Sequence, residues 1–164
     1  MGEHNLRVLM RRHPRGMVCL DDFTLERAEI PSPGAGEALV AVSYLSLDPY
    51  MRTRMDPLRS YVPALTPGEV MPGSTVGEVV ESNDPQLPKG TIVAGTSGWQ
   101  EYGLVTREAV RVIDPDAGSV TAALSVLGMT SVTAPDYAHR PRAWLLPLCT
   151  RDYCVGIPQR SHGA

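Results

Sequence analysis

The chain has 164 residues, of which 43% are hydrophobic and 20% are charged, which is an ordinary composition for a globular protein. Its net charge of −3 and its isoelectric point near 5.8 argue against a nucleic-acid partner. No apolar run reaches the length of a membrane span. Three cysteines and no secretory signal favour a reducing cytoplasm.

The sequence predicts short strands separated by turns, because it holds 15 glycines and 15 prolines. In the first expected strand Leu6, Val8 and Met10 share one face. A helix-like run over residues 120–127 follows Ser119, a suitable cap. Apolar alternation places the expected strands at residues 5–12, 23–30, 37–47, 74–82, 91–94, 99–106 and 109–113. Strands of this length and spacing predict a mainly β barrel or sandwich with short helices.

Residues 56–73 contain four prolines and two glycines, so we expect an irregular loop there. Long loops inside compact domains often cover a substrate. Tyr61 lies in this loop, where it could line a substrate site or lie on the surface.

A compact motif, YLSLDPYMRTRM, follows the strongest expected strand. Pro49 presets the angle of a first helical residue, so Asp48 is expected to cap the N–H groups that follow and start a short helical turn. That turn would project Tyr50 and Arg52 from a rigid corner. The alternative is that Asp48 and Pro49 merely end a strand, with Tyr50 packed on the core and the arginines solvated.

Five short strings occur in one order along the chain: Ser46–Arg52, Val79–Ser82, Lys89–Val93, Ser97–Trp99 and Leu127–Met129. Together they resemble the zinc-independent medium-chain dehydrogenase/reductases over residues 6–134. The similar branch is the leukotriene B4 12-hydroxydehydrogenase, prostaglandin reductase and NADPH-dependent curcumin (2-alkenal) reductase group.

The resemblance implies a partly open, GroES-like β-barrel that packs on a Rossmann domain binding NADPH. It implies hydride transfer to the β-carbon of an α,β-unsaturated ketone or aldehyde. Tyr50 would be the catalytic hydrogen-bond donor to the enolate oxygen. Asp48, Arg52, Tyr61 and Ser74 would join Tyr50 in binding the substrate.

The resemblance also implies that four residues face the cofactor, namely Gly128, Met129, Thr130 and Thr133. Zinc alcohol dehydrogenases carry a cysteine and a Gly-His-Glu where this chain has Leu45 and Gly73–Thr75, so no metal is expected. The barrel body contains no histidine, which argues against a histidine general base there. A zinc dehydrogenase and a generic quinone reductase are lesser alternatives.

The family pattern stops after Ala134. We therefore expect a catalytic domain over residues 1–134 and an irregular tail over residues 135–164, whose composition suggests translation in a shifted reading frame. No GxGxxG-like segment is present, so we expect a chain that lacks the Rossmann domain, does not bind NADPH alone and is inactive alone. A separate Rossmann-type chain or self-association would then supply a partner. The alternative is a GroES-like binding module without catalysis.

Overall fold

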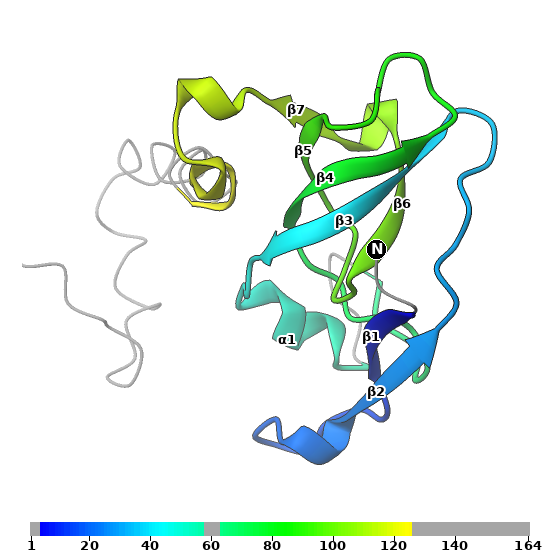
Figure 1. The fold of residues 1–164 in the computed structure, drawn as a ribbon. Coiled ribbons are helices and arrows are strands. Elements are labelled where there is room, and N and C mark those ends of the chain that lie inside the picture. Colours follow the sequence, from blue (N-terminus) through cyan, green and yellow to red (C-terminus); the bar gives the residue numbers. More distant parts are fainter. Residues whose placement is uncertain (1–3, 58–62, 126–164) are drawn as a thin grey trace, which may run out of the picture.

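The computed structural model describes residues 4–57 and 63–125, and the described strands form two antiparallel sheets (Figure 1). The smaller sheet pairs β1 (Asn5–Met10) with β2 (Phe23–Ala28). The larger sheet has the order β6-β3-β4-β5-β7. Its strands are β3 (Glu37–Leu45), β4 (Thr75–Ser82), β5 (Ile92–Gly95), β6 (Tyr102–Thr106) and β7 (Arg111–Ile113).

The helices of the described part are short. The α-helix α1 (Tyr50–Arg54) follows β3 and lies between the larger sheet and the β1–β2 hairpin (Figure 1). Single 3-10 turns are η1 (Leu20–Asp22), η2 (Arg107–Ala109), η3 (Pro115–Ala117) and η4 (Val120–Leu124). No helix in this part of the chain is long and apolar enough to cross a membrane.

The expected fold class, a mainly β and partly open barrel with short helices, is confirmed. Every expected strand is present, although several are shorter than predicted. β2 ends at Ala28, shortly before Pro31, which has no N–H to donate to a ladder. β6 begins at Tyr102 because the preceding residues pair elsewhere, with Gln100 bridging to Arg7 of β1.

The central pair of the larger sheet is β3 with β4, whose register shifts between Leu39 and Val40 and again between Val42 and Tyr44. Such irregularities bend a strand and increase its twist. Gly77 of β4 lies directly against β3, and a Cβ there would clash with the carbonyl oxygen of Ala41. The close approach of these two strands therefore requires glycine at this position.

The face of β1 that Leu6, Val8 and Met10 share is not uniformly buried. Met10 is buried, but Leu6 is exposed, whereas the polar Asn5 is 2% exposed. The Asn5 amide pairs with the backbone of Tyr102, donating to its carbonyl at 2.9 Å and accepting from its N–H at 2.9 Å. Asn5 is thus buried because it replaces a ladder hydrogen bond between the two sheets.

Two apolar clusters form the core. One lies within the larger sheet and comprises Ala38, Val40, Val79, Leu87, Val93, Val105 and Val110. The other, called here the methionine cluster, lies against α1 and comprises Met10, Met51, Met55, Leu65 and Met71. Because these residues come from separate segments, the methionine cluster fixes α1 against the hairpin and the loop that precedes β4.

Candidate functional site

The helical corner predicted after β3 is present as α1, but Asp48 does not cap it in the predicted way. The first helical position follows Pro49, whose φ of −56° is already helical. The backbone carbonyl of Asp48 accepts from the N–H of Met51 at 3.0 Å. Its carboxylate instead accepts from the Ser46 hydroxyl at 3.0 Å. The predicted side-chain cap is therefore wrong. A backbone hydrogen bond closes this turn, and the Asp48 carboxylate is directed back toward Ser46.

The length of α1 follows from its sequence. Met51 and Met55 are four residues apart and share the face that is buried in the methionine cluster. Pro57 disfavours helical geometry in the residue before it, so the helix ends within one and a half turns. This short helix is therefore held mainly by its buried face.

Tyr50 is half-buried, and its ring packs against the methionine cluster. Its backbone carbonyl accepts from the Thr53 hydroxyl at 2.6 Å. The alternative prediction, that Tyr50 packs on the core, is therefore confirmed for its ring. The role of the Tyr50 hydroxyl as a catalytic hydrogen-bond donor stays a prediction.

Arg52 is not a solvated side chain but ties α1 to a distant loop. Its Nη1 lies 3.0 Å from Oδ2 of Asp56, and its Nη2 donates to the carbonyl of Gly16 at 3.2 Å. On the other side of the helix, Arg54 donates through Nε to the carbonyl of Pro63 at 3.1 Å. The two arginines hold α1 between the loop after β1 and the loop before β4.

His13 was missed as a neighbour of this corner. It directly follows the first expected strand, outside the barrel body, yet its Nδ1 lies 2.8 Å from the carbonyl oxygen of Met55. A carbonyl only accepts, so Nδ1 carries the proton and donates this bond. No local pattern could reveal the contact, because it joins residues 42 positions apart.

Ser74 lies beside the strand end that leads into α1, since its carbonyl accepts from the Ser46 N–H at 2.8 Å. The neighbouring Gly73 is closely packed, because a Cβ there would lie 2.6 Å from Cδ1 of Leu45 and 3.0 Å from Nε1 of Trp99. That indole nitrogen is buried and has no hydrogen-bond partner, the one such side-chain atom in the described ranges. The structure thus joins the backbone of Ser74 to that of Ser46, whose hydroxyl donates to Asp48. The substrate role of Ser74 stays a prediction.

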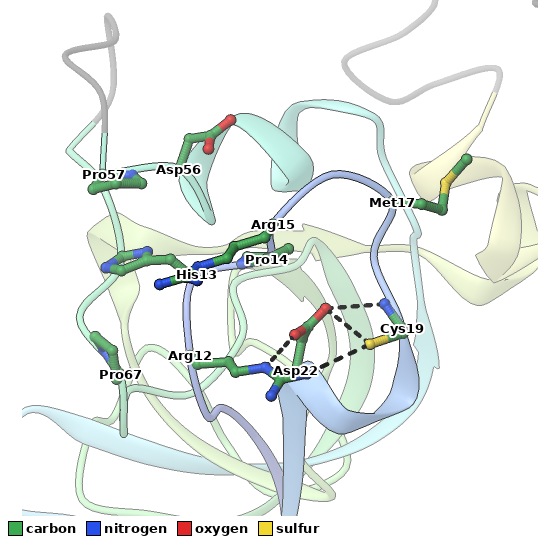
Figure 2. Close-up of a pocket in the computed structure, with 10 residues that line it drawn as sticks. All are labelled: Arg12, His13, Pro14, Arg15, Met17, Cys19, Asp22, Asp56, Pro57 and Pro67. Atoms are coloured by element: carbon green, nitrogen blue, oxygen red, sulfur yellow. Dashed lines mark hydrogen bonds and ion pairs between the residues drawn. The ribbon is translucent and has the colours of Figure 1, made fainter.

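A cavity of about 830 Å³ lies beside the end of α1 (Figure 2). Its wall includes Asp56 and Pro57, which follow the helix, and a group formed by Arg12, Cys19 and Asp22 (Figure 2). The other lining residues are His13, Pro14, Arg15, Met17 and Pro67.

Asp22 is a buried carboxylate held by three donors. Its Oδ1 accepts from Arg12 Nε at 2.8 Å, and its Oδ2 accepts from the backbone N–H of Cys19 at 3.0 Å and from the thiol at 3.4 Å. The bond to Arg12 lowers the pKa of Asp22, the Cys19 N–H adds to this effect, and the same side-chain bond raises the pKa of Arg12. This charged pair fixes the loop that forms one side of the cavity.

Several predicted residues lie outside the described residues. They are the substrate-side Tyr61, the cofactor-facing Gly128, Met129, Thr130 and Thr133, and the tail over residues 135–164. Within residues 4–57 and 63–125, no three His, Cys, Asp or Glu side chains gather in a way that could hold a metal ion.

Comparison with known proteins identifies the family. Residues 7–113 match the model of the N-terminal domain of oxidoreductase. The chain is 39% identical to the NADPH-dependent curcumin reductase of Escherichia coli over 132 residues, which is 80% of this chain and 38% of that protein. It is 33% identical over 136 residues to the NADP(+)-dependent 2-alkenal reductase of Nicotiana tabacum, covering 79% of this chain and 39% of that one.

A solved structure shows the same arrangement of elements. The crystal structure of CurA from Vibrio vulnificus in complex with NADPH superposes with a TM-score of 0.75 at 35% identity, covering 79% of this chain and 39% of that chain. The chain therefore spans less than two fifths of the length of each of these relatives. The predicted resemblance is confirmed, and the chain belongs to the family of oxidoreductase N-terminal domains.

Proposed function

We propose that this chain forms the substrate side of an NADPH-dependent reductase of the C=C bond in α,β-unsaturated ketones and aldehydes. The observation that carries the proposal is the match of 79% of the chain to a protein solved with NADPH bound. Relatives named for curcumin and 2-alkenal reduction support this substrate class. We also infer a zinc-independent enzyme, because Leu45 and Gly73–Thr75 offer neither thiolate nor imidazole. A cytoplasmic location is inferred from the cysteine usage, since three cysteines give no disulfide framework.

In such an enzyme NADPH supplies a hydride. The described residues do not fit the cofactor by themselves, since no helix among them begins with a glycine-rich turn suited to a pyrophosphate. What this chain contributes is a hydrogen-bond donor held near the substrate. A tyrosine hydroxyl keeps its proton at neutral pH and can donate to a developing enolate oxygen. We assign that role to Tyr50, which α1 holds in place through Met51, Arg52 and Met55.

An apolar surface at the end of β3 supports the need for a partner. Tyr44, Leu45 and Leu47 are all exposed there, next to the corner that leads into α1. Exposed apolar patches of this kind mark interaction sites. We propose that a Rossmann-type domain or chain covers this surface, and that the 164-residue chain alone neither binds NADPH nor reduces an enone.

The test is a chimera in which residues 5–113 of this chain replace the matched segment of the E. coli curcumin reductase. We expect the chimera to oxidise NADPH at 340 nm with 1-octen-3-one, while the 164-residue chain alone gives no turnover. In the chimera, Tyr50→Phe should lower kcat by roughly 100-fold, the loss typical for removing one donor to an oxyanion.

The matched control is Thr24→Val, which removes a hydroxyl from an exposed residue of β2, outside the corner and outside the apolar surface at the end of β3. It should leave kcat unchanged. A folded chimera that binds 1-octen-3-one and NADPH without turnover would refute the reductase and favour a binding module. Turnover by the 164-residue chain alone would refute the requirement for a partner.

A further inference from the structure

We propose that the cavity beside α1 is a binding site for an amphipathic monocarboxylate, a ligand with one carboxylate and an alkyl body. The cavity volume of about 830 Å³ falls in the range of small-molecule sites, which is roughly 300 to 1,000 Å³. This cavity is separate from the proposed catalytic site at Tyr50, because Tyr50 does not line it.

The charges around the cavity select for an anion. Its two carboxylates are already compensated, Asp22 by Arg12 at 2.8 Å and Asp56 by Arg52 at 3.0 Å. Arg15 forms no ion pair with any described residue. One guanidinium is therefore available, and a guanidinium binds a carboxylate through two parallel hydrogen bonds.

The position of Arg15 suits this task. Figure 2 shows His13, Pro14 and Arg15 between the helix end that carries Asp56 and the group around Asp22. Pro14 is buried, and the His13 bond to Met55 holds the neighbouring backbone against α1. The loop that carries Arg15 is also fixed by the bond from Arg52 to the carbonyl of Gly16. The cation is thus mounted on an anchored segment.

The rest of the wall selects for an alkyl body. Met17 is 85% exposed and lines the cavity. Prolines contribute further apolar surface, namely Pro14, Pro57 and Pro67. A flexible thioether adapts to alkyl chains of varied shape. Met17 lies on one side of the cavity and Pro57 and Pro67 on the other (Figure 2), so an alkyl chain in the cavity has apolar contacts while the carboxylate reaches Arg15.

The experiment is a titration of the 15N-labelled 164-residue chain with sodium octanoate, followed by 1H–15N spectra. We expect saturable shifts at the amides of residues 12, 13, 15–19 and 56, and about fourfold tighter binding for each buried methylene added from hexanoate to decanoate. Arg15→Gln should weaken octanoate binding about tenfold. Met17→Gln should remove much of the chain-length dependence.

The control is Arg27→Gln, which alters an exposed arginine of β2 outside the cavity and should leave the affinity unchanged. Both substituted arginines are exposed, so we expect both variants to fold. Spectra recorded without octanoate check this by comparison with those of the unmodified chain. Equal affinity for 1-octanol, an unchanged affinity in Arg15→Gln, or shifts confined to another surface would each overturn the proposal. Octanoate has no enone, so the outcome is independent of the proposed reductase function.

Discussion

At the scale of single residues, the charged group around Asp22 shows how a polar side chain is kept inside the fold. The carboxylate is 2% exposed, yet three donors satisfy it. A buried carboxylate left unpaired would be strongly unfavourable. The ion pair with Arg12 therefore matters more than the ion pair between Arg7 and Glu26 on the hairpin, because the Glu26 carboxylate is half-exposed whereas that of Asp22 is buried.

This arrangement predicts a pH dependence of stability. The folded-state pKa of Asp22 is lowered, first by the hydrogen bond to Arg12. Its contribution is therefore fully present above the unfolded-state pKa near 4 and is lost as the pH falls through the folded-state pKa. Asp22→Asn should lower the free energy of unfolding at pH 7 and flatten its fall as the pH drops below the unfolded-state pKa near 4, as measured by urea unfolding.

The control for that prediction is Asp21→Asn, which alters the exposed neighbour of Asp22 in η1. It should follow the pH profile of the unmodified chain. A profile for Asp22→Asn as steep as that of Asp21→Asn would contradict the assignment.

At the scale of elements, α1 is too short to be stable alone and depends on its anchors. Two of them reach the same loop after β1, since Arg52 donates to Gly16 and His13 donates to the carbonyl of Met55. Each bond restrains the distance between this loop and the helix. Breaking one should therefore weaken the other.

This dependence predicts a coupling between the two anchors. His13→Ala removes one hydrogen bond, and Arg52→Ala removes the bond to Gly16 together with a half-exposed ion pair to Asp56 that contributes little, so each should lower the free energy of unfolding by about 1 kcal/mol. The double variant should lose less than the sum, by about 0.5 kcal/mol, because the first change already loosens the shared contact. Guanidinium unfolding of the four chains measures the cycle.

A parallel cycle of His13→Ala with Arg27→Ala supplies the control. Arg27 lies on β2, in neither the loop nor the helix. The changes in the free energy of unfolding caused by Arg27→Ala and His13→Ala should therefore add. Strict additivity in the Arg52 cycle as well would show that the two bonds act independently.

At the scale of the whole molecule, the surface that remains apolar is as informative as the core. The residues at the end of β3 stay exposed although the methionine cluster lies close by, and Leu47 is 70% exposed. The chain spans under two fifths of its relatives. The exposed end of β3 is consistent with a surface that another domain or copy covers.

We therefore expect the isolated chain to self-associate through this surface. Leu47→Glu should shift sedimentation profiles at high concentration toward the monomer, because a charge in an apolar contact is costly. The matched control is Leu25→Glu on β2, which is 69% exposed but belongs to the other sheet. Equal effects of the two variants would show that association is not specific to the end of β3.

The strands, the fold class and the family could be read from the sequence because they rest on local signals. Alternating apolar residues place β3 and β4, and the strings around Asp48 and Trp99 carry the family resemblance. The corner after β3 was predicted for the same reason, since Pro49 acts within its own turn. Even there the capping by Asp48 was wrong, because the choice between a side-chain and a backbone acceptor depends on where Ser46 lies.

The sequence by itself determined the class of the fold and the order of the strands along the chain, since periodicity and turn chemistry act over a few residues. Its short strings carried the resemblance to the oxidoreductase family, which the family match confirms. Only the tertiary structure decided which distant side chains meet. The bond from His13 to Met55 spans 42 positions, and the burial of Asn5 depends on Tyr102, 97 positions away. Such contacts, and the cavity beside α1, exist because packing brings together segments whose spacing in the chain carries no signal of their proximity.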